Sequence, residues 1–351
     1  MFVIKIVLSP LGSRTVFSWE YSRKKISLYD VAMNDGPSAR CYHGRMHLTV
    51  AVYFDDPSFD GYPFTKDEYR ASYHDFARLL ASKGATFAIV RGKETYMGRN
   101  TFSRAWVFDG ASFVERKGPF RPDVIYDKGT AAFDADARMS HDPGLDKICT
   151  RKDETYALFP DVSPLTMRID AADDIEPALT RMRTDLVVIK PVDGQEGDGV
   201  HVLAHDAVAS AIPSFPYLIQ EFIDTSGGIP GVTEGRHDLR IVSILGEPIL
   251  AFVRTPPTGS YLANVSQGGS TIEVPVARLP AGALELFRKV DAAMRRFPHR
   301  LYSTDMGLDR SGRWFLIELN AKPALFGRHR GPAFALFHER LADLLLSCID
   351  R

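Results

Sequence analysis

A loop of lysine and glycines between two strand-like runs constrains the fold of this chain most. The apolar run DLVVIK ends at Lys190, and PVDGQEGDGV follows, with Gly194, Gly197 and Gly199 ahead of the next apolar segment. Such glycines let backbone N–H groups close over a phosphate without steric cost. A Walker A loop needs lysine and a hydroxyl after its last glycine, and a Rossmann fingerprint opens a helix. Neither pattern fits here, and a solvated hairpin is the alternative.

The length and composition are those of a globular protein. The 351 residues suggest two or three domains. Apolar residues make up 45%, charged residues 25%, and the net charge is -1, so we expect no nucleic-acid partner. Cys41, Cys149 and Cys348 lack CxxC spacing and favour a reducing cytoplasm. The opening MFVIKIVLSP is too short for a membrane span, so we expect no membrane association and interpret it as the first β-strand.

Strand-like and helix-like runs alternate over the first 140 residues. FVIKIVLS, HLTVAVYFDD, TKDEYRASYHDFARLLASKG and ATFAIVRG predict an α/β domain with a mostly parallel sheet. In the helix-like run, Thr65 is the expected N-cap, with Glu68 three positions on, and Gly84 is the expected stop. The turn-forming stretch DADARMSHDPGLDK predicts a domain boundary near residue 140.

The rest of the chain has the pattern of two α+β subdomains. We expect one over residues 141–223, with the helix RKDETYALF and the glycine loop, and one over residues 224–351. The second contains the strands LRIVSIL, PILAFVRT, LYSTDMGL and WFLIELN and ends in the helical pattern AFALFHERLADLLLSCI. The predicted organisation is therefore three parts, 1–140, 141–223 and 224–351.

Hard oxygen ligands lie near the C-terminus. Asp305 stands in YSTDMGL, and Glu318 and Asn320 share one face of the strand FLIELN. Two carboxylates and an amide oxygen suit Mg²⁺ when phosphates complete its shell. Surface solvation is the alternative, but an unpaired carboxylate in so apolar a strand costs several kcal/mol and calls for a cation.

Taken in order, these motifs resemble the ATP-grasp superfamily. KP..G..G.GV, QEFI, DLR, an arginine on a later strand, N..QGG and D.G...G...IELN..P follow one another from about residue 147 to 330. The pattern is most similar to the branch of glutathione synthetase and the ribosomal-protein glutamate ligases. The resemblance implies an ATP-grasp fold, in which two α+β subdomains enclose ATP after an N-terminal domain, with Mg²⁺, or Mn²⁺ in its place.

The resemblance also implies a nucleotide-binding set. Two lysines would approach the phosphates and adenine N7, the glycines would cover the β- and γ-phosphates, a hinge would bind the adenine edge, and an aspartate would lie near the ribose. These residues are Lys152, Lys190, Gly194, Gly197, Gly199, Gln220, Glu221, Phe222, Ile223 and Asp238. Lys147 is a rival for the role of Lys152, and YLIQEFI could equally be a plain core strand. The acidic Glu196 and Asp198 depart from the family's lid.

Three further residues receive catalytic roles from the resemblance. Arg254 and Arg240 would neutralise charge on the transferring phosphate, and Asn264, with the turn at 267–269, would cover the acceptor. Ordinary ion pairs and a plain loop are the alternatives for these residues. Lys322 and Arg328, close after Asn320, depart from the small residues of relatives and could bind an acidic substrate or form surface ion pairs.

The implied function is an ATP-dependent ligase that joins a small-molecule carboxylate to an amine through an acyl phosphate and releases ADP and phosphate. A small-molecule kinase and a ligase that acts on a peptide or protein are alternatives, and a nucleotide-binding regulatory module is a third. A homodimer is expected from the family. The identities of the acid and the amine stay open.

Overall fold

The computed structural model describes short strands within residues 5–25 and then residues 48–194, 198–263 and 268–349. The chain divides into two compact units, Met1–Met46 and His47–Arg351. In the first unit, strands pair antiparallel, β1 with β2 and β3 with β4. Their bounds are β1 (Lys5–Leu8), β2 (Thr15–Ser18), β3 (Glu20–Tyr21) and β4 (Lys24–Lys25). The predicted first strand is thus present as β1, but it pairs with β2 rather than with the parallel strands that follow.

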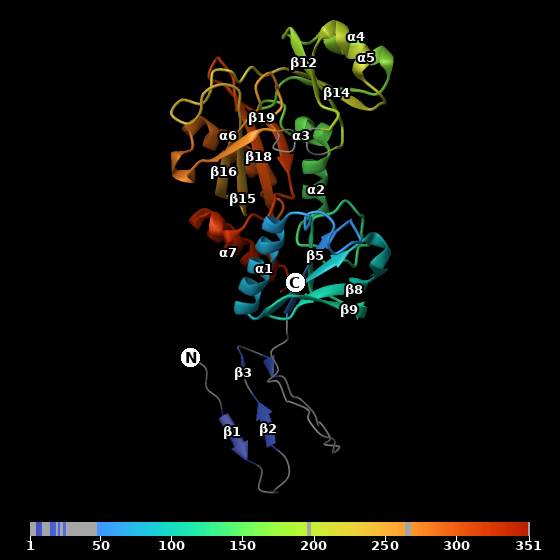
Figure 1. Cartoon of the computed structure of the whole chain (residues 1–351), viewed down its shortest axis with the longest axis vertical. Helices are drawn as coiled ribbons and strands as arrows, with labels where there is room; N and C mark the ends of the chain where they lie inside the picture. The colour runs from blue at the N-terminus through green and yellow to red at the C-terminus, as the bar shows by residue number, and fades with distance from the viewer. Residues whose placement is uncertain are drawn as a thin grey trace. The chain divides into compact units, whose positions relative to one another are not determined.

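A mixed sheet of six strands opens the second unit, in the order β10-β5-β6-β8-β7 with β9 also paired to β8 (Figure 1). Only the β10–β5 and β5–β6 pairs among these are parallel. The strands are β5 (Leu48–Phe54), β6 (Ala85–Arg91), β7 (Tyr96–Gly98), β8 (Thr101–Phe108), β9 (Phe113–Phe120) and β10 (Val124–Asp127). The predicted α/β class is confirmed, but the sheet is not mostly parallel, because β8 and β9 form a hairpin closed between Asp109 and Ser112.

Strand β5 shows why this sheet is covered on both faces. Val50, Val52 and Phe54 pack into one hydrophobic cluster, whereas Ala51 and Tyr53 pack into another. The alternation follows from the two-residue repeat of a strand. All five side chains are buried, as expected for a parallel strand at the centre of an α/β sheet.

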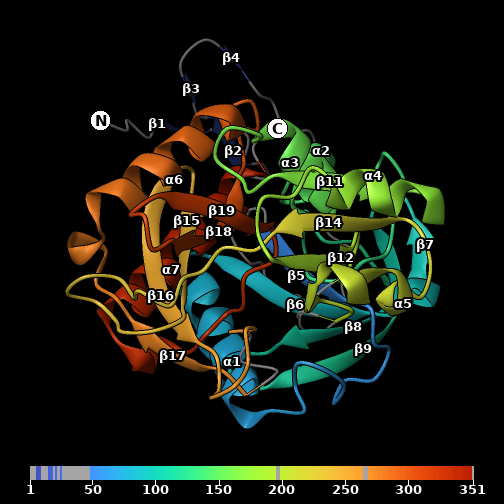
Figure 2. The same ribbon diagram turned by 90° about the horizontal axis from the view of Figure 1, so that it is seen from above.

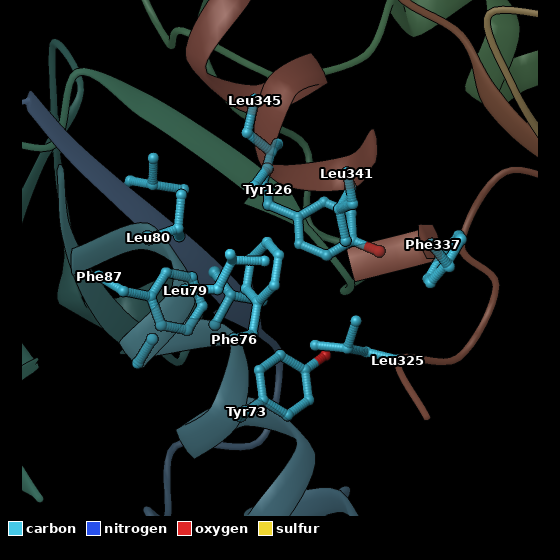
Figure 3. Close-up of a cluster of buried hydrophobic side chains, with 14 of the residues drawn as sticks. Tyr73, Phe76, Leu79, Leu80, Phe87, Tyr126, Leu325, Phe337, Leu341 and Leu345 are labelled. Atoms are coloured by element: carbon cyan, nitrogen blue, oxygen red, sulfur yellow. The ribbon is translucent and has the colours of Figure 1, made fainter. Parts of the chain in front are cut away.

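Helix α1 (Asp67–Ser82) covers the first of these faces. Tyr73, Phe76 and Leu80 lie at helical spacing and are fully buried (Figure 3). The prediction of Thr65 as the N-cap is wrong, because the first helical carbonyl is that of Lys66, which accepts from the next turn of the helix. Gly84 adopts a φ of +83° just after the helix, as expected for a glycine stop.

Two helices, α2 (Pro143–Thr150) and α3 (Lys152–Leu158), lead from the first sheet to a small antiparallel sheet of order β11-β14-β12-β13. Its strands are β11 (Thr166–Ile169), β12 (Leu186–Pro191), β13 (His201–Ala204) and β14 (Tyr217–Glu221). Helices α4 (Ile175–Leu179) and α5 (Val208–Ala211) cover one face. Ile169, Ile189 and Ile219 form the centre of this core.

A five-stranded antiparallel sheet of order β17-β16-β15-β18-β19 follows (Figure 2). Its elements are β15 (Asp238–Ile244), β16 (Glu247–Thr255), β17 (Ser270–Glu273), β18 (Leu301–Leu308), β19 (Trp314–Asn320) and helix α6 (Ala281–Met294). Leu239 and Ile241 pack with α6, whereas Val242 and Ile244 pack in the cluster of α1 and β5. The C-terminal helix α7 (Pro332–Ser347) belongs to the same cluster, so the first and third sheets share one core.

Short 3-10 turns complete the described elements: Lys93–Thr95, Ala172–Asp174, His205–Ala207, Val276–Arg278 and Arg328–Arg330. Within the described part of the chain, no helix has the length and apolar character that crossing a membrane requires.

Leu341 tests the shared core. Replacing Leu341, which is fully buried in α7, by alanine should lower the free energy of unfolding by about 2 to 5 kcal/mol, because it leaves a cavity between two sheets. Leu336→Ala in the same helix, where the side chain is 41% exposed, should change it by less than about 0.5 kcal/mol. Urea unfolding of the two variants measures the difference, and equal losses would contradict this account of the core.

Candidate functional site

A cavity of about 150 Å³ lies between the small sheet and the third sheet. Its walls come from β12, β14, the start of α3, the loop before β15 and the end of β19. Among the predicted residues, it is lined by Lys152, Lys190, Gly194, Gln220, Glu221, Phe222, Ile223, Asp238 and Glu318. Residues that are separated by more than 160 positions in the sequence therefore surround one space.

Lys190 is buried at the end of β12. Its Nζ donates to the hydroxyl of Tyr156 and, at 2.8 Å, to Oε1 of Gln220. Burial lowers the pKa of Lys190 to about 7, because desolvation outweighs the attraction of Glu318. A cation held in this way gains most from an anion that enters the cavity.

Lys152 begins α3 and is also buried. Its Nζ donates to the carbonyl of Gly194 at 2.7 Å and lies 3.5 Å from Oε1 of Glu318. The rival Lys147 instead pairs with Glu154 on the surface, where its side chain is 61% exposed. The structure therefore favours Lys152 over Lys147 for the predicted role.

The predicted hinge is partly used by the protein itself. Gln220 donates from Nε2 to Thr166, and it accepts from Lys190. The backbone amides of Glu221 and Phe222 donate to Leu165 and Thr184. A bound base would therefore depend on other backbone groups at this edge or on local rearrangement.

Four charged side chains form a cluster on the third sheet, in which Asp238, Arg254 and Asp305 are buried and the side chain of Arg240 is 23% exposed. Asp238 lies opposite Arg254, and Arg240 lies opposite Asp305, on paired strands. Arg254 donates twice to Asp238, at 2.6 Å each, and once to Asp305 at 2.7 Å. Arg240 donates twice to Asp305, at 2.7 and 2.6 Å. Asp238 and Arg240 thus do not pair with each other, as a surface Asp-x-Arg pair would.

The two arginines determine the charge of Asp305. Burial alone would raise the pKa of its carboxyl, but Arg240 and Arg254 outweigh that effect and hold the pKa below its usual range. Asp305 is therefore ionised at neutral pH although it is 2% exposed.

The predicted metal ligands lie on neighbouring strands. Asp305 is the register partner of Glu318, and Asn320 is paired with Ser303. Asn320 uses Oδ1 to accept from the backbone of Lys322 at 2.7 Å. No group of three or more His, Cys, Asp or Glu side chains within the described ranges is arranged to hold a metal. The two facing carboxylates still suit a hard cation, since ionised oxygens are what Mg²⁺ prefers.

The glycine loop is described in part. Gly194 and Gly199 have φ values of +134° and +69°, which favour glycine. Gly197 and Glu196 lie outside the described residues, as do Asn264 and Gln267. Asp198 lines the cavity.

Comparison with known sequences supports this assembly. Residues 154–296 match the family profile described as the ATP-grasp domain of prokaryotic glutathione synthetase. Residues 154–296 of this chain therefore resemble an ATP-grasp domain. A relative named probable alpha-L-glutamate ligase, from Legionella pneumophila (strain Corby), is 31% identical over 172 residues, which cover 47% of this chain and 51% of the relative. The glutathione synthetase of Prochlorococcus marinus (strain CCMP1986) is 37% identical over 91 residues, 24% of this chain and 27% of that protein.

The match thus spans about half the length of this glutamate ligase and about a quarter of the glutathione synthetase. Solved structures extend the likeness in fold. D-alanyl-alanine synthetase A from Vibrio cholerae superimposes with a TM-score of 0.59 at 13% identity over 88% of this chain and 98% of that one. A Chryseobacterium gregarium RiPP-associated ATP-grasp ligase gives 0.54 at 14% identity over 86% and 97%. The predicted ATP-grasp fold is confirmed.

Sequence reasoning missed three side chains: two that line the cavity and one that contacts a lining residue. Tyr156 bridges Lys190 and the carbonyl of Ile317, and His237 and Tyr261 line the cavity. Tyr156 follows Lys152 by four positions on one helix face, so that spacing could have indicated it. His237 and Tyr261 lie in irregular segments, which leave no periodic signal.

Proton uptake tests the environment of Lys190. At pH 8 its amine is mostly neutral in the free protein, since its pKa is about 7. Phosphates beside it would raise that pKa, so ATP binding should take up about one proton. Calorimetry in two buffers of different ionisation enthalpy measures the uptake. Lys190→Met should abolish it, and Lys289→Met, which removes an exposed lysine, should not.

Arg254 tests the charged cluster. Arg254→Met should lower the free energy of unfolding by about 3 to 5 kcal/mol, because it leaves two carboxylates buried close together. The matched change Arg310→Met removes a side chain that is 73% exposed and should cost less than about 1 kcal/mol. Chemical denaturation compares them, and a small loss for Arg254→Met would show that water reaches the cluster.

Proposed function

We propose that this protein is an ATP-dependent ligase that joins a carboxylate to an amine and forms an amide or peptide bond. An oxygen of the substrate carboxylate would attack the γ-phosphorus, and ADP would leave. The amine nitrogen would then attack the acyl carbon, phosphate would leave, and the amine would lose a proton. Positioning and charge neutralisation would carry the chemistry, as in phosphoryl transfer generally.

One observation carries the proposal: two buried lysines from different elements converge on a cavity that also contains Glu318 and Asp238. Lys190 is desolvated and Lys152 faces the glycine loop, which is a suitable arrangement for a polyphosphate. The names of the relatives, glutamate ligase and glutathione synthetase, support the same class of reaction.

The nucleotide would lie along this cavity. Lys152 and Lys190 would contact phosphates, and the glycine loop, including Gly194 and Gly199, would cover them. The segment Gln220–Ile223 would lie against the base, and Asp238 near the ribose. These roles follow the family pattern, and the lining of the cavity is compatible with them.

The arginines would act on charge that develops during transfer. Arg254 has a planar fork of donors, and Arg240 lies on the neighbouring strand, so both could neutralise phosphate oxygens once they exchange part of their contact with Asp305. Asn264 would cover the acceptor. Asp305, Glu318 and Asn320 would hold Mg²⁺, which when bound supplies electrostatic stabilisation of the phosphates.

Several wider assignments belong to the same proposal. The substrates would be a small carboxylic acid and an amine, the enzyme would act in the cytoplasm, and it would form a homodimer. The parts 1–140, 141–223 and 224–351 would serve as an N-terminal domain and two ATP-grasp subdomains. The shared core of the first and third sheets suggests that residues 48–127 are fixed to the third part.

Product analysis tests the proposal. The protein would be incubated with Mg²⁺, ATP and pools of carboxylic acids and amines, and the nucleotides, phosphate and new masses separated. The account predicts ADP and phosphate only when an acid and an amine are both present. AMP and pyrophosphate would contradict the acyl-phosphate route, and ADP with a stable phosphorylated product would identify a kinase.

Glu318 offers a sharper test. Glu318→Gln should lower turnover by about two orders of magnitude or more, because it removes a charge at the reacting phosphates and keeps the shape. The melting temperature should change little, since its side chain is 34% exposed. Glu285→Gln, at a side chain that is 68% exposed, is the control. Full activity of Glu318→Gln would exclude its role.

A further inference from the structure

A second and larger cavity, of about 490 Å³, lies beside the loop that joins β10 to α2. Its titratable lining consists of Asp127, Asp134, Asp142, Asp146, His141, His299 and Lys322. None of these residues lines the nucleotide cavity. The two cavities are nevertheless linked through β19, because Lys322 follows Asn320 by two positions and its backbone amide donates to that residue.

The topology of the first sheet favours a ligand at this place. From β5 the chain crosses to β6 on one side and later returns to β10 on the other side. Open α/β sheets bind ligands outside the carboxyl ends of their strands, at the point where the strand order reverses. Asp127, which lines the cavity, is the last residue of β10, at that point.

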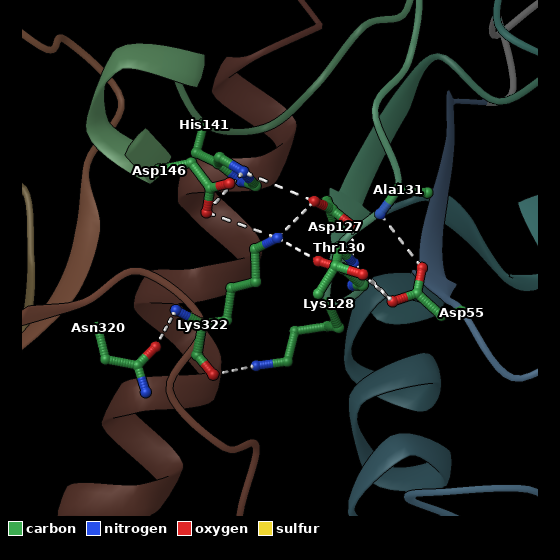
Figure 4. Close-up of polar contacts among 10 residues, drawn as sticks. Asp55, Asp127, Lys128, Thr130, Ala131, His141, Asp146, Asn320 and Lys322 are labelled. Atoms are coloured by element: carbon green, nitrogen blue, oxygen red, sulfur yellow. Dashed lines mark hydrogen bonds and ion pairs between the residues drawn. The ribbon is translucent and has the colours of Figure 1, made fainter. Parts of the chain in front are cut away.

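The ammonium group of Lys322 pairs with part of the acidic lining of this cavity. Its Nζ donates to Asp127 at 2.7 Å and to the carbonyl of Gly129, and it lies 3.5 Å from Asp146 (Figure 4). Lys128 donates to the carbonyls of Lys322 and Pro323 and does not line the cavity. One ammonium group therefore faces the carboxylates of Asp127 and Asp146.

Two acceptors are left without hydrogen bonds within the described ranges. His141 has a side chain that is 9% exposed, and its Nε2 lies 3.9 Å from both Asp127 and Asp146, beyond hydrogen-bond distance. Burial lowers the pKa of His141, so the ring is neutral at neutral pH and one ring nitrogen can accept. The buried Oδ1 of Asp146 also lacks a hydrogen-bond partner.

The charge of the lining selects the ligand. Four aspartates and one lysine line the cavity, so an anion would meet net repulsion and a cation would be attracted. A metal ion is disfavoured, because it needs several free oxygen ligands and the carboxylate of Asp127 is already bonded to Lys322 and to the backbone of Gly129. An ammonium group, with three donors, suits Asp146 and His141.

Apart from Thr130, Ser140 and His299, the remainder of the lining is apolar. Phe133, Met139 and Pro298 contribute side chains, and alanines fill much of the loop. Such a surface favours a compact hydrocarbon body attached to the charged group. Polyamines, whose charge is spread along the chain, would gain less from it.

We propose that this cavity binds a small primary amine with a compact apolar body, through Asp146 and His141. That this molecule is the amine joined to the carboxylate rests on the proposed function. The cavity would bind the amine whether or not the protein catalyses the ligation.

Three probes of similar shape test which charge the cavity prefers. They are 2-phenylethylamine, a cation, 2-phenylethanol, which is neutral, and 3-phenylpropanoate, an anion. Calorimetric titration of the full chain without nucleotide should show millimolar or tighter binding of the amine and at least about tenfold weaker binding of the other two. Equal or tighter binding of 3-phenylpropanoate, or no binding of the amine at millimolar concentration, would overturn the proposal.

Asp146→Asn locates the site. It should weaken amine binding by about tenfold or more, because it removes the charged acceptor at constant size. Asp173→Asn, which neutralises an exposed aspartate on the small sheet's side, should leave the affinity unchanged. Wild-type affinity in Asp146→Asn would overturn the assignment, and an unchanged melting temperature with retained ATP binding establishes that the variant is folded.

A parallel ATP turnover assay keeps the two proposals separate. Amine binding without ADP release in any acid and amine pool would sustain the site and reject the ligase. ADP release without amine binding at this cavity would sustain the ligase and reject the site. Incorporation of the bound amine into the product would support both.

Discussion

The rest of the structure depends on four charges clustered on the third sheet. Asp238, Arg254, Asp305 and Arg240 alternate across paired strands, so each carboxylate lies within hydrogen-bond distance of an arginine. A one-residue slip in β15 would place Asp238 and Arg240 on the opposite face, in the apolar core under α6, and leave Arg254 and Asp305 without these partners. The cluster therefore fixes the register of the strands that supply the functional cavity. It also keeps Asp305 ionised and in place beside Glu318.

The same electrostatic effect links the charged cluster to the proposed nucleotide cavity. Lys190 on β12 is an amine whose charged form is disfavoured by burial between two neutral partners, and Asp305 is an anion held by two cations. Both arrangements become more favourable when phosphates and a divalent cation enter, because each new charge finds a preformed opposite charge. Lys152, between Gly194 and Glu318, connects the two sides. The charged side chains that stabilise the fold are thus the same ones that would bind the phosphates and the divalent cation.

Much of this could be predicted from the sequence, and the exceptions have physical causes. Lys190, Glu318 and Asp305 could be recognised because charges that interrupt apolar strands require a partner. The fold class followed from alternating periods together with the order of the motifs. The pairing of Asp238 with Arg254 could not be predicted, because strand register depends on contacts between distant segments. Tyr156 was overlooked although it follows Lys152 by one helical turn, and Thr65 was misplaced as a cap because the turn before α1 makes Lys66 the first helical acceptor. The antiparallel β8–β9 hairpin was missed although Asp109-Gly110, between the two strand-like runs, is a hairpin signal.

The central claim is that the buried lysines and the charged cluster enclose ATP between the small sheet and the third sheet. A crystal structure of the full chain with Mg²⁺ and a non-hydrolysable ATP analogue tests it most directly. The account predicts phosphate oxygens within hydrogen-bond distance of Lys152 and Lys190, and the metal on Asp305 and Glu318. A nucleotide bound elsewhere, or phosphates that contact neither lysine while Lys190 keeps its bonds to Tyr156 and Gln220, would contradict it.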